Sequence, residues 1–443
     1  MGEIDRRQFA HALAALSLGA LARPGRVRAA ARGRVAVVGG GPAGATVAVT
    51  LKRAAPALAV TLIEPKRHYT SCFYSNHFIG GFLSFDRITN GYDGLAALGI
   101  EVVHDRAAAI DAERREVRLA AGGRVPYDSL AVAPGIGFRF GAIEGYTEAA
   151  SEVMPHAWTG GHQTRLLRAQ LEAMEDGGLV VIAAPRNPYR CPPGPYERAC
   201  LIANYLMREK PRSKVLVLDP KMAFSKQAVF EEAIEKYYKG IVELQLTNDL
   251  DDMGVARVDS RTGEVVTRSG ETFKAAVANI IPDQTAGTLA REAGLADAGG
   301  WCPIHPETFR SMLVDGVYVL GDAAIAADMP KSAFSAASQA RGVAANILAD
   351  LTGAERPVAA YRNTCWSMLA PDDSVKIGAD YAPGDLKGKH ALVPKGAFIS
   401  QTGESAALRK ETYEESLAWY LTLTDDMFAK SASATGRQPG GRG

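Results

Sequence analysis

The sequence predicts an α/β protein with two Rossmann-like, doubly wound domains and a smaller α+β domain at the C-terminal end. Three observations predict this: a glycine-rich loop between an apolar strand and an Ala-rich helix, apolar runs alternating with helical patterns in the centre, and a change of pattern after Leu351. The chain has 443 residues, of which 47% are hydrophobic. That length suits roughly two or three domains with large cores.

Residues 1–31 predict an export signal that precedes the fold. They contain the pair Arg6 and Arg7, a short apolar run at 9–22, and small residues up to Ala31 that suit cleavage. The pattern resembles a twin-arginine signal peptide. We therefore expect cleavage near Ala31 and a periplasmic mature chain without an integral membrane segment. A formal net charge of +1 and the lack of a basic stripe argue against a nucleic-acid partner.

The stretch RVAVVGGGPAGATVAVTL predicts a dinucleotide-binding turn. The apolar strand Val35–Val38 precedes a GxGxxG pattern, an Ala-rich helix follows it, and an acid stands 20 residues beyond the third glycine. Glycines let the backbone approach a pyrophosphate, the helix N-terminus attracts its charge, and the acid accepts hydrogen bonds from ribose. The predicted cofactor-binding residues of this turn are Gly39, Gly41, Gly44 and Glu64.

The central segment predicts a second parallel sheet of the same kind. Helical patterns at 164–177 and 226–240 alternate with apolar runs at 179–184, 214–219 and 273–282, which we interpret as strands. A phosphate loop should follow the first of these strands. The chain instead continues AAPRNPYRCPPGPYERAC, whose prolines remove backbone donors that a phosphate needs. The sequence thus argues against NAD(P) in this position.

After Leu351 the sequence becomes rich in turn-forming and aromatic residues, then hydrophilic, and 415–430 reads as a helix. We expect a third domain here. The tail SASATGRQPGGRG has the composition of a disordered segment. The predicted boundaries are 32–150 with 295–356 for a first, discontinuous domain, 151–294 for the second, 357–430 for the third and 431–443 for the tail.

The chain contains five cysteines: Cys72, Cys191, Cys200, Cys302 and Cys365. The sequence holds no CxxC, no CxxCH and no histidine cluster, so we predict no metal site and no haem attachment in this chain. In an oxidising compartment Cys191 and Cys365 could form a disulfide, but the sequence does not show which cysteines meet. Cys72 could equally be a buried small hydrophobe.

Two further stretches indicate a flavin. DGVYVLGDAA, at 315–324, resembles the late Gly-Asp motif of FAD-containing disulfide reductases, in which the acid binds the ribityl chain; the matching residue is Asp322. LAVAPGI, at 130–136, resembles the intermediate strand and turn of the same superfamily, with Pro134 where threonine is commoner. The resemblance implies two domains of the FAD-dependent disulfide reductase type.

From the signal to about Lys430, the sequence resembles the flavoprotein subunit of flavocytochrome c sulfide dehydrogenase. The motifs are GGGPAGATVA, HYTSCFYSNHFIGG, NPYRCPPGPYERA, YVLGDA followed by MPKSAFSAASQA, and YRNTCWSMLAP. The resemblance implies FAD bonded covalently to Cys72, a redox-active disulfide between Cys191 and Cys365, and a proton-transferring acid at Glu197. Lys331, at the start of a helix, would stabilise reduced flavin.

Each of these residues could instead have a purely structural role. The Cys191 and Cys365 pair could be a structural staple, and Glu197 could be a first-turn acid favoured by the helix dipole. Cys200 and Cys302 are expected to be inert thiols.

The resemblance implies oxidation of hydrosulfide to sulfur or polysulfide, with electrons passed through FAD to a c-type cytochrome that carries the haem. A sulfide:quinone oxidoreductase is the first alternative; it needs amphipathic membrane helices near the C-terminus, whereas the helix at 415–430 is acidic. An NADH-dependent reductase is disfavoured by the missing second glycine fingerprint. A non-catalytic exported flavoprotein is the remaining alternative. Loss of Cys191, Cys365 or the GxGxxG pattern would have favoured it, but the sequence retains all three.

Overall fold

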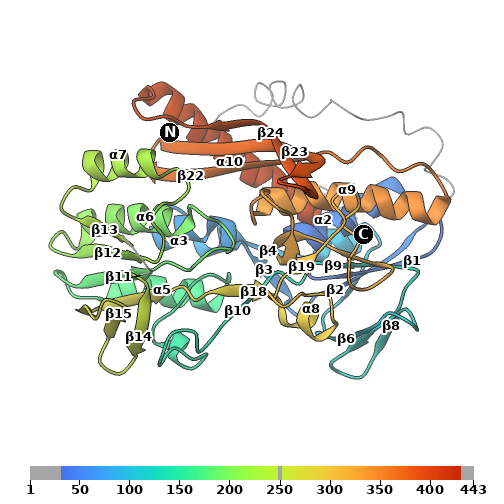
Figure 1. The fold of residues 1–443 in the computed structure, drawn as a ribbon, viewed down its shortest axis with the longest axis horizontal. Helices are drawn as coiled ribbons and strands as arrows, with labels where there is room; N and C mark the ends of the chain where they lie inside the picture. Colours follow the sequence, from blue (N-terminus) through green and yellow to red (C-terminus); the bar gives the residue numbers. More distant parts are fainter. Residues whose placement is uncertain (1–30, 248–251, 431–443) are drawn as a thin grey trace, which may run out of the picture.

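The computed structural model describes residues 31–247 and 252–430, and they form three parts (Figure 1). The predicted signal, apart from Ala31, and the predicted tail lie outside the described residues. In Figure 1 the first part is mostly blue and cyan, the second green, and the C-terminal part orange and red. The C-terminal sheet and its helix extend along one side of both other parts.

The first part contains a five-stranded parallel sheet whose strands come from distant segments. Its order is β20 (Val317–Val319), β9 (Ser129–Val132), β1 (Arg34–Val38), β2 (Ala59–Ile63) and β5 (Glu101–Val103). The helices α2 (Pro42–Ala54) and α9 (Ala333–Thr352) pack against each other beside it. Both helices are rich in alanine, which lets them approach closely.

The second part contains a four-stranded parallel sheet. Its order is β13 (Val242–Leu246), β12 (Lys214–Asp219), β11 (Leu179–Ala183) and β17 (Val277–Ile280). Its helices are α5 (His162–Ala173), α6 (Gly194–Glu209) and α7 (Gln227–Tyr237). The strand predicted at 273–282 is two separate strands, because β16 (Thr272–Lys274) leaves this sheet to pair with β15 (Glu264–Thr267).

The C-terminal part is an antiparallel sheet of β22 (Tyr361–Ala370), β23 (Asp373–Leu386) and β24 (Lys389–Ile399), followed by α10 (Ala406–Phe428). The turn-forming residues at the start of this part did not predict β22 and β23, which are long strands, each pairing interrupted by one shift in register. β22 contacts α6, α7, α9 and α10 and is buried along most of its length, so it lacks the alternation that marks a half-exposed strand. The helix also begins earlier than predicted, at a cap in which Ser405 accepts a hydrogen bond from Leu408 N.

Shorter elements connect these parts. They are β3 (His68–Thr70), α3 (Ser75–Ile79), β4 (Thr89–Gly91), α4 (Asp93–Ala97), β6 (Ala107–Asp111), β7 (Glu116–Leu119), β8 (Arg124–Pro126), β10 (Ile136–Phe138), β14 (Val255–Asp259), β18 (Gln284–Ala286), α8 (Thr288–Glu292), β19 (Cys302–Pro303) and β21 (Ala324–Ile325). The mixed α/β class, with FAD-reductase-like domains and a smaller C-terminal part, is confirmed. Within the described ranges, every helix is too short or too polar to cross a bilayer.

The C-terminal part contributes to the cores of both other parts. Met427 and Phe428 of α10 lie in the apolar core of the first part, whereas Leu369 and Ala370 of β22 lie in that of the second. Phe428 packs against Tyr92, whose hydroxyl donates a hydrogen bond to the carbonyl of Gly40. The last turn of α10 therefore supports the glycine-rich loop from behind.

Replacing Phe428 with alanine is expected to lower the free energy of unfolding by about 3–5 kcal/mol, as for buried aromatic residues in general. Phe428 is 1% exposed. Urea unfolding followed by circular dichroism measures the change. Leu421→Ala on the same helix is the control: Leu421 is 54% exposed, and surface substitutions usually change stability by less than about 0.5 kcal/mol. Equal losses in the two variants would contradict the proposed packing.

Candidate active site

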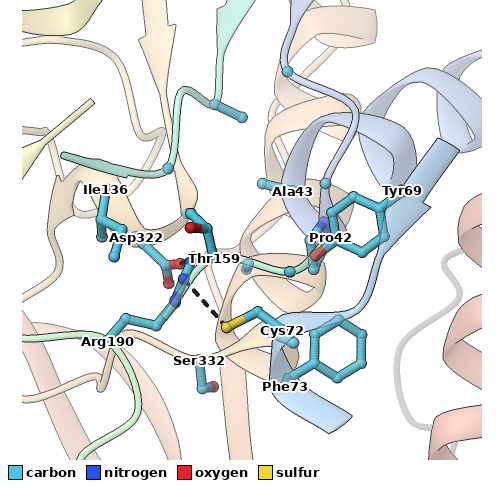
Figure 2. A pocket seen from close by; sticks show the side chains of 18 of the residues that line it. Pro42, Ala43, Tyr69, Cys72, Phe73, Ile136, Thr159, Arg190, Asp322 and Ser332 are labelled. Carbon is cyan, nitrogen blue, oxygen red and sulfur yellow. Dashed lines mark hydrogen bonds and ion pairs between the residues drawn. The ribbon is translucent and has the colours of Figure 1, made fainter. Parts of the chain in front are cut away.

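A cavity of about 440 Å³ lies where the three parts meet. The glycine-rich loop and Asp322 come from the first part, Arg190 and Cys191 from the second, and Cys365 from the third. Figure 2 shows the region around Cys72 and Arg190, with Asp322 and the start of α2 beside it. The cavity therefore collects most of the residues that the sequence singled out.

The glycine-rich loop has the close contacts that its glycines predict. Gly39 has φ +98°, and a Cβ there would lie 2.2 Å from the carbonyl oxygen of Ala133. A Cβ on Gly44 would lie 1.9 Å from the carbonyl oxygen of Gly39, so the helix start and the strand end pack backbone to backbone. Gly41 lines the cavity at the N-terminus of α2. The carboxylate of Glu64 accepts a hydrogen bond of 2.8 Å from Gly40 N and also lines the cavity.

Asp322 supplies an unused acceptor in this cavity. Its Oδ1 is buried and has no hydrogen-bond partner among the described residues, while Oδ2 faces Arg190 Nη1 at 3.4 Å. A buried carboxylate oxygen needs a donor, and a polyol chain such as ribityl offers several. Together with the glycine loop, this orphaned oxygen fits FAD. The matched families support FAD as the cofactor.

Lys331 lies just before α9 and is held by main-chain groups. Its ammonium donates to the carbonyl oxygens of Asp322 and Ala324 and lies 3.9 Å from the ring centroid of Trp301. Lys331 is not among the residues that line the cavity, whereas the first turn of α9, beginning at Ala333, is. Stabilisation of a reduced flavin by Lys331 stays a prediction. Burial lowers the pKa of Lys331 to about 8.

Cys72 lies on the cavity wall in polar contact with Arg190. Its thiol donates a hydrogen bond of 3.0 Å to the carbonyl oxygen of Trp158, and Arg190 Nη2 lies 3.3 Å from the sulfur (Figure 2). Arg190 also faces Asp322. The Cys72 sulfur therefore faces the cavity in polar surroundings, within reach of a ligand bound there.

Cys191 and Cys365, 174 positions apart, are brought together by the fold. Their side chains lie close enough to hydrogen-bond to each other, and both line the cavity as free thiols. Cys191 has φ +89°, a left-handed conformation that is uncommon outside glycine and concentrates at functional sites. Contact between the two residues makes a disulfide feasible, and the disulfide itself remains a prediction. Cys200 and Cys302 are buried away from the cavity.

Glu197, on the first turn of α6, is buried beside the cysteine pair. Its Oε2 accepts a hydrogen bond of 2.7 Å from Asn76 Nδ2, and its Oε1 accepts one of 2.9 Å from Met368 N. Burial raises the pKa of Glu197, while the two hydrogen bonds oppose that rise. Glu197 therefore combines access to the cavity with a raised proton affinity, as a proton-transfer group requires.

Asn76 and Arg198 form a supporting network that the sequence analysis missed. Arg198 is 1% exposed and donates to Asn76 Oδ1 at 2.9 Å. It also donates to Asn279 Oδ1 and to the carbonyl oxygens of His156 and Ala157. Because its Oδ1 faces Arg198, the amide of Asn76 must turn its NH₂ toward Glu197. Both residues stand inside quoted motifs, but only the fold reveals their burial.

The fold and this site define a flavin-dependent oxidoreductase of the disulfide oxidoreductase class. Residues 33–173 match the family model of the pyridine nucleotide-disulphide oxidoreductases. Residues 164–282 match the central region of the sulfide dehydrogenase [flavocytochrome c] flavoprotein chain, and residues 357–428 match the flavin-binding region of flavocytochrome c sulphide dehydrogenase. Two separate regions of the chain are thus similar to flavocytochrome c sulfide dehydrogenase flavoprotein chains.

Curated relatives agree with this assignment. The flavoprotein chain of sulfide dehydrogenase [flavocytochrome c] from Chlorobaculum thiosulfatiphilum is 49% identical over 43 residues, which are 10% of this chain and 90% of that sequence. The mitochondrial sulfide:quinone oxidoreductase of Mus musculus is 22% identical over 341 residues, covering 74% of this chain and 73% of the relative.

Solved structures share the fold. The sulfide:quinone oxidoreductase from Aquifex aeolicus superposes with a TM-score of 0.65 at 18% identity and covers 89% of this chain and 92% of its own. The NAD-dependent persulfide reductase from A. fulgidus gives 0.58 at 16% identity, covering 86% of this chain and 77% of its own. At these identities the likeness concerns the fold alone.

Replacing Asn76 with leucine is expected to raise the pKa of Glu197 further, because the substitution removes a donor that favours the carboxylate. Infrared difference spectra of the protonated carboxyl stretch, recorded against pH, measure this, and Glu197→Gln identifies the band. The protonated band should persist to higher pH in Asn76→Leu than in the unsubstituted protein. An unchanged titration would contradict a role of Asn76 in tuning Glu197.

Proposed function

We propose that the protein oxidises hydrosulfide through a disulfide between Cys191 and Cys365, using FAD, and passes the electrons to a c-type cytochrome. The observation that carries this proposal is the contact of the two thiols on the wall of the cofactor cavity, with a buried carboxyl beside them. Similarity to a sulfide-oxidising flavoprotein family supports the substrate.

In this mechanism hydrosulfide attacks one sulfur of the pair, leaving a persulfide on that cysteine and a thiolate on the other. Glu197 holds or releases the accompanying proton, since its raised pKa suits proton transfer nearer neutral pH than an ordinary glutamate. Cys191 and Cys365 are reactive centres, whereas Asn76 and Arg198 position Glu197. The sulfur leaves as elemental sulfur or polysulfide.

FAD, when bound, takes up a pair of electrons and can release them singly. The glycine loop with Glu64 would hold its adenosine and pyrophosphate end, and Asp322 its ribityl chain. We propose a covalent bond from Cys72 Sγ, which lies beside Arg190 in the cavity. Lys331 fixes the Asp322 loop through two carbonyl groups and is a positioning residue here.

The proposed electron acceptor is a c-type cytochrome, and a quinone is the alternative. The relative from Chlorobaculum is by name the flavoprotein chain of a flavocytochrome c, which supports a cytochrome partner carrying the haem. Similarity to the mouse sulfide:quinone oxidoreductase favours a quinone as the alternative. Steady-state assays with sulfide and either horse cytochrome c or decylubiquinone separate the two, and reduction of quinone alone would overturn the cytochrome proposal.

We also propose that the mature chain works in the periplasm, on the basis of the twin-arginine pattern at Arg6 and Arg7. Fractionation of cells producing the full chain tests this. Substitution of both arginines by lysine should retain the protein in the cytoplasm, whereas unchanged export would contradict the predicted route.

Replacing Cys191 with serine is expected to abolish flavin reduction by sulfide, because no disulfide can form, and to leave reduction by dithionite intact. Anaerobic absorbance titration of the flavin band measures both. Cys200→Ser is the matched control, since Cys200 is buried on α6 outside the cavity and should retain near-stoichiometric reduction. Reduction by NADH with sulfide inert would overturn the proposed function.

Replacing Cys72 with serine is expected to convert a covalent flavin into a dissociable one. The unsubstituted protein should keep its flavin fluorescence on a denaturing gel, and Cys72→Ser should lose it completely while still binding FAD under native conditions. Cys302→Ser, at a buried site outside the cavity, should keep the fluorescence. Flavin released from the unsubstituted protein by acid would contradict a covalent bond.

A further inference from the structure

Lys226 is a buried lysine beside the cysteine pair that the proposed mechanism does not use. It lies at the start of α7 with φ +65° and is 3% exposed. Its ammonium donates a hydrogen bond of 3.1 Å to the carbonyl oxygen of Cys365 and one of 2.8 Å to Ser367 Oγ. These bonds hold the Lys226 ammonium against the strand that carries one of the two reactive sulfurs. Burial lowers the pKa of Lys226, whereas Cys365, Glu197 and Cys191 oppose that shift.

The charge of Lys226 has no ion-pair partner among the residues that the structure describes. The titratable groups facing it are Glu197 from α6, Cys191 from the loop before that helix, and Cys365 from β22. Glu197 already accepts hydrogen bonds from Asn76 and Met368 N. A buried ammonium is costly unless an opposite charge lies near it, and a thiolate on the reduced cysteine pair would provide one.

The two cysteines differ in their surroundings. The hydrogen bond with Cys191 lowers the pKa of the Cys365 thiol most strongly, burial opposes this shift, and the charge of Lys226 lowers the pKa further. Lys226 is also hydrogen-bonded to the main chain of Cys365. The pKa of Cys191 is raised, because of its hydrogen bond with Cys365 and its burial. The charge of Glu197 raises the pKa of both thiols, so it does not distinguish Cys191 from Cys365.

We propose that Lys226 assigns the thiolate of the reduced pair to Cys365 and thereby makes Cys191 the sulfur that hydrosulfide attacks. The inference rests on the proposed disulfide mechanism. In thiol exchange the sulfur that is more stable as a thiolate leaves faster. Lys226 touches neither substrate nor cofactor, so it is a positioning residue that acts through Cys365.

The step balances in atoms and charge. The sulfur of HS⁻ forms a bond to Cys191 Sγ, the bond between Cys191 and Cys365 breaks, and its electron pair stays on Cys365 Sγ. The disulfide is the oxidant. The attacking sulfur is oxidised to the outer sulfur of a Cys191 persulfide, which keeps the proton, and Cys365 is released as the thiolate beside Lys226.

The first experiment tests the charge assignment without sulfide. The holoprotein, reduced anaerobically with dithiothreitol, is treated with iodoacetamide across a range of pH, and each cysteine peptide is quantified by mass spectrometry. Cys365 should react at lower pH than Cys191. In Lys226→Gln, which keeps a donor but removes the charge, the midpoint for Cys365 should rise by about one pH unit or more.

Two further variants control for damage to the fold. Lys226→Arg keeps the charge and should keep the low midpoint. Lys239→Gln, which replaces an exposed lysine that follows α7, should behave like the unsubstituted protein. If Cys191 reacts at the lower pH in the unsubstituted protein, or if the midpoint for Cys365 is the same in Lys226→Gln, the proposal is overturned.

The second experiment maps the persulfide. The oxidised holoprotein receives one equivalent of sulfide, is quenched in acid and is alkylated. The persulfide should be found on the Cys191 peptide, and in Lys226→Gln it should be divided between the two cysteines. Persulfide on Cys365 of the unsubstituted protein overturns the assignment. Persulfide on neither cysteine overturns the proposed function instead, and the alkylation profile still decides the role of Lys226.

Discussion

The site depends on the hydrogen bonds of one buried carboxyl group. Glu197 belongs to the second part, and it accepts hydrogen bonds from Asn76 of the short helix α3 and from Met368 N of the C-terminal part. Loss of either hydrogen bond would raise the free energy of the folded protein, since a buried carboxylate without donors is strongly destabilised. The geometry that joins the three parts is therefore the same geometry that places Glu197 beside the cysteines.

The buried cations around the cavity give its cysteines different surroundings. Arg190 lies against Cys72, and Lys226 lies against the strand of Cys365, whereas Arg198 supports Glu197 through Asn76. In a poorly hydrated site these charges are little screened, and their effect on each sulfur falls with distance. A single cavity can thus hold one cysteine within reach of a bound ligand and two others that differ in thiolate stability.

Sequence reasoning succeeded where the chain's local pattern dictates structure. The fold class and the tight turn at Gly39 and Gly44 follow from short-range sterics. It did not foresee the two carbonyl groups that bind the Lys331 ammonium, and it failed for β22, whose burial on both faces hides its periodicity. The roles of buried polar residues such as Asn76 and Lys226 could not be predicted from the sequence, because their hydrogen-bond partners lie more than a hundred positions away.

The prolines after β11 argue against a nicotinamide site at the place where this fold would offer one. Pro192, Pro193 and Pro195 lack an N–H, and the N–H of Gly194 is bonded to the carbonyl oxygen of Cys191. A pyrophosphate would find these donors missing at the start of α6. The tight turn also brings Gly194 so close to Cys191 that a Cβ would lie 3.3 Å from its sulfur. The residues that disfavour a dinucleotide at this position therefore also place the Cys191 sulfur just before the N-terminus of α6, close to Cys365.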